Sequence, residues 1–142
     1  MSWSVTGLTV LLVTLALATL VGVALRRRDG VPREVRGDVE LLTSGDLHAE
    51  LGERATLVQF SSAFCQPCRA TRRVLGEVTA MVPGVAHVEI DAESRLDLVR
   101  SLNILRTPTV LVLDASGRVV KRASGQPRKA DVIGALGLAV GE

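Results

Sequence analysis

Aromatic side chains are scarce in this chain of 142 residues. It has no tyrosine, two phenylalanines and one tryptophan, and aromatic residues make up 2% of the sequence. Hydrophobic residues make up 47%, so the core of a globular domain must be built almost entirely from aliphatic side chains. The net charge is only +2, which is too small a basic excess to indicate nucleic acid as a partner.

Cysteine and histidine are also rare. The two cysteines, Cys65 and Cys68, form a C-x-x-C pair, and the two histidines are His48 and His87. A structural zinc site needs four ligands, and these histidines are the only nitrogen donors available to complete one. The spacing therefore favours a redox-active pair over zinc ligation, and two core cysteines at helical spacing are the remaining alternative.

The C-x-x-C pair lies between the apolar run 56–60 and a segment with helical periodicity. If Cys65 begins that helix, Cys68 lies one turn inside it. Unpaired N–H groups and the helix dipole then stabilise a thiolate, lowering its pKa from about 8.5 into roughly the 3.5–7.5 range. Pro67 suits the first helical turn, where its missing N–H has no partner to lose. Cys65 is then the attacking thiolate and Cys68 the resolving thiol.

Charged side chains are absent from residues 1–25, and residues 5–25 are almost continuously apolar. A helix over this run is about 31 Å long, enough to cross a hydrocarbon layer of roughly 30 Å. A cleavable signal peptide is the alternative, but it has basic residues before a shorter apolar run. We therefore predict a transmembrane anchor at 1–25, with residues 5–25 in the lipid bilayer.

Arginines follow this anchor, and no Lys or Arg precedes it; they are Arg26, Arg27, Arg28, Arg33 and Arg36. This asymmetry favours a cytoplasmic position for the C-terminal side of a single-pass protein of the cell membrane. Residues 26–37 show no periodicity and contain glycine and proline, so we predict a basic juxtamembrane linker there. The soluble domain is expected at 38–142.

Strands and helices alternate through the soluble domain. Apolar patterns predict strands at 39–42, 55–61, 85–91, 109–113 and 118–123. Helices are expected from Ser44 or Asp46 to Leu51, from the cysteines to Val82, after a Ser94–Asp97 capping box, and from Gln126 onward. Their predicted core residues include Met81 and Ile133 at the helical stripes. The order indicates an α/β domain with a mixed central sheet flanked by helices.

Two motifs in residues 38–142 resemble the thioredoxin family. The segment Phe64-Cys65-Gln66-Pro67-Cys68-Arg69 is similar to its W-C-G-P-C-K motif. Arg106-Thr107-Pro108-Thr109 resembles its second signature, in which a cis proline lies beside the active-site disulfide. The resemblance implies a thioredoxin-like fold and dithiol–disulfide exchange. Its partners would be protein disulfides and a thioredoxin-reductase-like electron donor, with no metal and no cofactor beyond the Cys65–Cys68 disulfide.

The resemblance also implies roles for individual residues. Cys65 would be the nucleophile and Cys68 the resolving thiol, and Thr107 would offer backbone groups to an extended substrate. The substrate groove would comprise Phe64, Gln66, Pro67, Thr107 and Pro108.

Departures from the family pattern occur at four positions. Gln59 lies where the family usually has a buried aspartate that deprotonates the resolving thiol, and a glutamine cannot take up that proton. His87 lies where the family often has a lysine; it is either an exposed strand residue or, titrating near 6.5, part of proton transfer. Phe64 and Gln66 replace the usual Trp and Gly.

The sequence thus predicts a membrane-tethered thiol–disulfide oxidoreductase that reduces protein disulfides. One alternative is a disulfide reductase or isomerase on the exported side, such as one in cytochrome maturation. The other is a thioredoxin-like adaptor without catalysis, against which the intact C-x-x-C pair argues.

Overall fold

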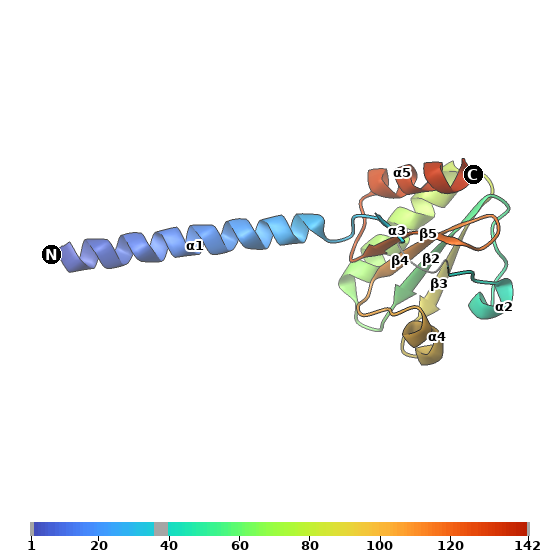
Figure 1. Ribbon diagram of the computed structural model, residues 1–142, viewed down its shortest axis with the longest axis horizontal. Coiled ribbons are helices and arrows are strands. Elements are labelled where there is room, and N and C mark those ends of the chain that lie inside the picture. The colour runs from blue at the N-terminus through green and yellow to red at the C-terminus, as the bar shows by residue number, and fades with distance from the viewer. Residues whose placement is uncertain (1, 36–39, 142) are drawn as a thin grey trace.

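The computed structural model describes residues 2–35 and 40–141 of the chain. A long helix, α1 (Ser2–Arg28), projects from an α/β domain that contains all the other elements (Figure 1). These are β1 (Arg33–Glu34), α2 (Ser44–Leu47), β2 (Ala55–Ser61), α3 (Gln66–Met81), β3 (Val85–Asp91), α4 (Leu96–Ser101), β4 (Thr109–Asp114), β5 (Val119–Ser124) and α5 (Lys129–Val140).

The predicted mixed sheet is confirmed. Its five strands lie in the order β1-β5-β4-β2-β3, with β2 parallel to β3 and the other neighbours antiparallel. All seven residues of β2 are buried, because this strand has a neighbour on each side and helices over both faces. The end of this central strand brings the chain to the cysteines.

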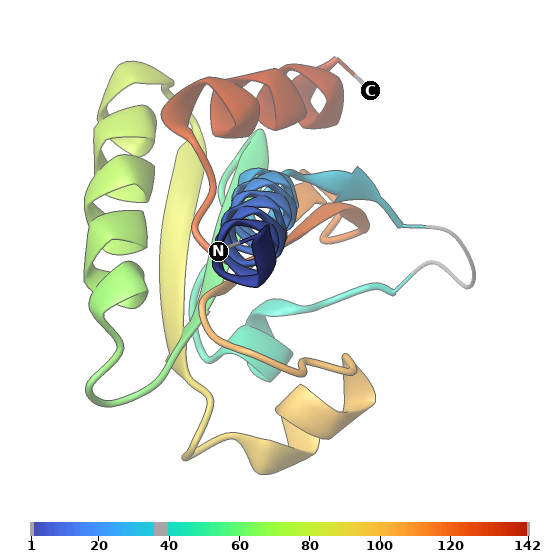
Figure 2. The same ribbon diagram turned by 90° about the vertical axis from the view of Figure 1, so that its left-hand side faces the viewer.

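Helices cover both faces of the sheet (Figures 1 and 2). Successive residues of β2 point to opposite faces, so Leu57 packs in the core beneath α3 and α5, and Val58 packs in the core on the side of α2 and α4. Phe60 is fully buried in this second core, where the other buried side chains are aliphatic. The aliphatic core expected from the composition is confirmed.

The edge of the sheet differs from the prediction. Leu41 makes a single bridge to Arg118 in place of the strand expected at 39–42, and Val39 lies outside the described residues. The rest of the β5 edge pairs with β1, which lies in the segment 26–37 predicted as a linker. That segment also holds the last turn of α1. Sequence periodicity cannot reveal a two-residue strand, because its pairing depends on β5.

Three helix starts were also predicted wrongly. The helix expected from Gln126 begins at Lys129, and Arg128 is its N-cap. Thr43, not Ser44 or Asp46, is the N-cap of α2, and Asp46 completes its capping box. The helix ends at Leu47 because His48 takes a left-handed conformation. Ser94 does not cap α4; its hydroxyl donates to the Asp91 carbonyl, and α4 begins after that turn.

Two predicted core residues are exposed, because each lies beside the buried stripe of its helix. On α3 the buried positions are Cys68, Thr71, Leu75 and Val78, and this spacing leads to Val82. Met81 is consequently 58% exposed. On α5 the buried stripe includes Val132, Ala135 and Leu136, so Ile133 is turned about 100° away from Val132 and is 40% exposed.

Candidate active site

The two cysteines are joined at the start of α3. Their sulfur atoms form a disulfide with an S–S distance of 2.07 Å. Cys65 is the N-cap residue, and its Sγ accepts a hydrogen bond from the Cys68 backbone N–H at 3.2 Å. Cys65 is partly exposed, whereas Cys68 is only 2% exposed. Cys65 is therefore the more accessible residue of the pair, and its part as the attacking thiolate stays a prediction.

Local sequence explains how the cysteines come to a helix start. After β2 the chain reverses through Phe64, whose positive φ of 59° lies in the left-handed region. Its side chain is 100% exposed. Pro67 lies in the first turn of α3, where no N–H partner is lost, so the helix begins immediately after Cys65.

A second loop lies beside the cysteine loop. The Thr107–Pro108 peptide bond is cis, as the resemblance implied. The hydroxyls of Ser62 and Thr107 are hydrogen-bonded at 2.9 Å, which connects the two loops. Pro67, Thr107 and Pro108 line one pocket of about 440 Å³. The structure therefore brings together these three predicted groove residues.

Phe64 and Gln66, the other two predicted groove residues, are exposed on either side of Cys65. They flank the disulfide, whereas the pocket is formed on the side of Pro67. Contact between a substrate and any of the five residues stays a prediction.

Gln59 lies beneath the disulfide and is fully buried. Its Nε2 donates to the Cys68 carbonyl and to the Ser61 hydroxyl, both at 2.9 Å. Its Oε1 accepts from His87 Nε2 at 3.1 Å. Because the Gln59 side-chain amide bonds the Cys68 carbonyl, it holds the first turn of α3 in place. This amide carries no titrating group. A part for Gln59 and His87 in proton transfer stays a prediction.

The surroundings of His87 favour its neutral form. It is half-buried, and burial lowers the pKa of its imidazole below the ordinary value of 6.5. The Glu89 carboxylate opposes this shift, and the Arg72 guanidinium adds to it. Arg72 and Glu89 form an ion pair with each other, which in turn lowers the pKa of Glu89. His87 is thus not an exposed strand residue, and its pKa lies below the ordinary value of a histidine.

Replacing His87 with glutamine is expected to remove part of the acid sensitivity of the fold. Because its folded pKa is lowered, the unfolded chain binds a proton first as the pH falls through 6.5, and stability falls with it. The loss is complete below the folded pKa. Unfolding in urea, measured between about pH 8 and pH 5, should show a shallower slope in His87→Gln. His48→Gln, at an exposed site, is the matched control and should keep the full slope; an unaltered slope in His87→Gln would contradict the assignment.

The contacts of the cysteines and histidines bear on the two alternatives to a redox-active pair, which are zinc ligation and separate core thiols. The His87 ring is hydrogen-bonded to Gln59, and Nδ1 of the exposed His48 lies 3.3 Å from an Arg95 nitrogen. Cys65 and Cys68 are bonded to each other. These contacts agree with a redox-active pair rather than with zinc ligands or separate core thiols.

Sequence reasoning missed the polar residues that support the site, namely Ser61, Ser62, Glu89 and Arg72. In the parallel register, Gln59 lies opposite Glu89 and Leu57 opposite His87. Alternation along β3 indicates that His87 and Glu89 share a face, but only the pairing register places them against Gln59.

A helix-capping disulfide beside a cis-proline loop, carried by a mixed sheet with helices on both faces, defines the thioredoxin-fold class. Solved structures agree with this fold. Chloroplastic thioredoxin z superposes with a TM-score of 0.59 and 23% identity over 76% of this chain and 99% of that one. The thioredoxin of Fasciola hepatica gives a TM-score of 0.54 and 18% identity over 62% of this chain and 83% of that one.

Sequence comparisons identify the family. The Thioredoxin family model matches residues 38–136, and the chain belongs to the thioredoxin family. Thioredoxin domain-containing protein 2 of Homo sapiens is 33% identical over 72 residues, which are 49% of this chain and 13% of that protein. Thioredoxin H5 of Oryza sativa is 27% identical over 77 residues, 54% of this chain and 56% of that protein. The matched segment therefore covers about half the length of thioredoxin H5 and a small part of thioredoxin domain-containing protein 2.

Proposed function

We propose that the protein is a membrane-tethered thiol–disulfide oxidoreductase that reduces protein disulfides. The observation that carries this proposal is the Cys65–Cys68 disulfide at the start of α3, where Cys65 is partly exposed and Pro67 lines a pocket. This disulfide is the form in which the cysteine pair remains after its dithiol form has reduced one substrate disulfide.

The reaction begins from the dithiol form. The Cys65 thiolate attacks one sulfur of a substrate disulfide, forming a mixed disulfide and releasing the first substrate sulfur as a thiolate. The Cys68 thiolate then attacks Cys65 Sγ, which forms the Cys65–Cys68 disulfide and releases the second substrate sulfur. Two electrons and two protons pass in all from the cysteine pair to the substrate. A dithiol donor of the thioredoxin-reductase type returns the pair to the reduced form.

The surrounding residues have separate parts in this scheme. The helix start stabilises the Cys65 thiolate, because the Cys68 N–H in the first turn donates to its sulfur and the helix dipole favours negative charge there. Thr107 and Pro108 line the pocket in which the chain next to a substrate cysteine binds, and Pro67 forms its wall on the side of the cysteines. Gln59 fixes the Cys68 carbonyl, so the proton of the resolving thiol passes to water or to the departing substrate thiolate.

Tethering rests on α1. Residues Ser4–Arg28 are long and apolar enough to cross a membrane, and this helix is fully exposed in the structure. A signal sequence near an N-terminus passes the same test of length and hydropathy. The arginines Arg26, Arg27 and Arg28 at its end favour a cytoplasmic domain. A reducing cytosol keeps the dithiol form populated, and the tether raises its effective concentration near membrane-bound substrates.

Reduction of insulin by the full chain in detergent, with dithiothreitol as electron donor, tests the chemistry. The proposal expects aggregation of the released insulin chains well above the rate with dithiothreitol alone. A rate equal to that background would leave the non-catalytic adaptor as the better description.

Cysteine labelling in intact cells tests the side of the membrane. After mild permeant reduction, a membrane-impermeant maleimide should leave Cys65 unmodified until the cells are lysed, and a permeant maleimide should label it at once. Labelling by the impermeant reagent before lysis would place the domain outside and favour the exported-side reductase or isomerase.

A further inference from the structure

The residues just after α1 are packed against the catalytic domain. Gly30, just after the helix, donates its N–H to the Ser124 carbonyl at 2.7 Å. Its φ is +77°, and a Cβ there would lie 1.9 Å from the Gln126 carbonyl oxygen, so only glycine fits this close approach. The Asp29 carboxylate also pairs with Arg106 at 3.4 Å. These contacts connect α1 to the loops that precede α5 and β4.

The pairing of β1 with β5 continues this attachment. β1 begins at Arg33, and Glu34 Oε1 lies 3.3 Å from Lys121 Nζ on β5. Because these contacts follow within a few residues of the end of α1, the connection between the helix and the domain is short. The face of the domain that holds these contacts therefore lies next to the end of α1.

The same connection brings α1 close to the active site. Arg26, from the last turns of α1, and Asp29 line the pocket that Pro67, Thr107 and Pro108 also line. The first turns of α3 and α5 lie on the side of the domain from which α1 leaves (Figure 1), and α1 projects in front of the domain when viewed from that side (Figure 2). The disulfide at the start of α3 is on this side.

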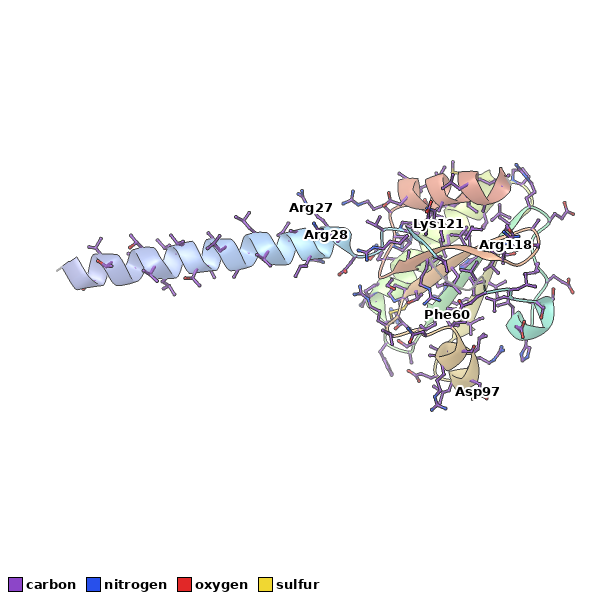
Figure 3. The ribbon with its side chains drawn as sticks, viewed as in Figure 1. Arg27, Arg28, Phe60, Asp97, Arg118 and Lys121 are labelled. Atoms are coloured by element: carbon purple, nitrogen blue, oxygen red, sulfur yellow. A yellow bond between two sulfur atoms is a disulfide. The ribbon has the colours of Figure 1, made fainter. Side chains whose placement is uncertain are left out.

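The pocket carries an excess of positive charge. Among the described residues, its lining includes the cations Arg26, Arg106, Arg128 and Lys129 and the carboxylate of Asp29. Arg106 pairs with Asp29, and Lys129 Nζ lies 3.1 Å from Glu77 Oε2, so Arg26 and Arg128 are the two cations for which no ion pair is recorded in the described part of the chain. Arg27 and Arg28 lie at the adjoining end of α1 (Figure 3). In a helix that crosses the bilayer up to Arg28, these arginines are at the level of the lipid headgroups.

The geometry points to a further role for the cations around this pocket: they bind anionic lipid headgroups and hold the Cys65 side of the domain against the bilayer, while the part of the pocket beside Pro67, Thr107 and Pro108 is left to the substrate. We call Arg26, Arg106, Arg128 and Lys129 the headgroup surface. The inference rests on the proposed membrane span of α1. It narrows the substrates of the proposed reductase to disulfides in segments of membrane proteins that lie next to the bilayer.

Energy transfer measures this contact without requiring activity. In full-length Cys68→Ser, a fluorescent donor is attached to Cys65, and the protein is reconstituted in vesicles with an acceptor on the lipid headgroups. Transfer should be higher in phosphatidylcholine vesicles that contain phosphatidylglycerol than in phosphatidylcholine alone, and high salt should abolish the difference.

Substitutions identify the surface. Arg128→Ser with Lys129→Ser should lower the ratio of bilayer-bound to free domain by roughly thirtyfold, given the usual attraction of two cations to an anionic membrane. The matched control, Arg54→Ser with Arg118→Ser, removes the same charge from another pocket, and Arg118 lies on the far side from α1 (Figure 3). Equal energy transfer in the two lipid mixtures would overturn the inference. An equal loss of energy transfer in the control variant would also overturn it.

A pair of substrates separates this inference from the proposed function. The same disulfide peptide is presented either free or coupled to a lipid headgroup, and the two reduction rates are compared for each variant. The intact protein should favour the coupled peptide, and a flexible Gly-Ser insertion between Arg28 and Asp29 should lower that preference. Reduction of both peptides without preference would refute the lipid-facing site and leave the reductase standing. Failure to reduce either would refute the reductase, while energy transfer still decides the inference.

Discussion

Replacing Cys65 with serine is expected to lower the rate of protein-disulfide reduction by about a thousandfold or more, because the attacking thiolate is lost. A serine hydroxyl at the start of α3 stays protonated near neutral pH, and an alcohol does not exchange with a disulfide. Cys65 is the partly exposed member of the pair, so Cys68, at 2% exposure, cannot take over the attack. Insulin reduction by the full chain in detergent measures the effect.

Replacing Cys68 with serine should give a different result. The first exchange still proceeds at Cys65, but no second sulfur releases the substrate, so a mixed disulfide accumulates. It appears as a band of higher mass on a non-reducing gel that disappears on reduction. A Cys65→Ser protein treated in the same way is the control and should form no such band. Trapping through Cys68 in the Cys65→Ser protein would show that the two roles are assigned in the wrong order.

Replacing Phe60 with alanine is expected to lower the free energy of unfolding by about 3–5 kcal/mol. Phe60 is fully buried in the core between the sheet and the helices α2 and α4. Its neighbours are branched aliphatic residues held by the sheet, so they cannot collapse into the space that the ring leaves.

The second phenylalanine provides the matched control. Phe64 is 100% exposed, so Phe64→Ala removes the same ring and should alter the free energy of unfolding by less than about 0.5 kcal/mol. Protease resistance of the full chain in increasing urea, with the disulfide intact, measures both variants. Similar losses in the two variants would mean that the Phe64 ring packs against the domain.

Much of the site could be predicted from the sequence because its parts are local. Cys65, Pro67 and Cys68 are within one helical turn, so their spacing alone places both sulfurs at the start of α3. The apolar run of β2 and the stripe of α3 likewise follow from short-range periodicity. Met81 and Ile133, which were expected to be buried, each lie one residue away from the buried stripe of their helix. The sequence does not fix the position of such a stripe to within one residue.

The polar layer under the disulfide could not be predicted, because it depends on pairing between distant strands. The sequence shows only that Gln59 has no titrating carboxyl group. Its contacts with His87 and the Cys68 carbonyl follow from the parallel register of β2 and β3 and from the position of α3 above them.

The sequence by itself determined the class of the domain, the pair of cysteines at a helix start, and the apolar helix before them. These features depend on residue type and on spacing within a few turns or one strand. Only the tertiary structure decided how α1 is attached, which cations share a pocket with Pro108, and what holds Gln59. Such relations join residues far apart in the chain, and they are set by the packing of glycines such as Gly30 and by strand register rather than by any local pattern.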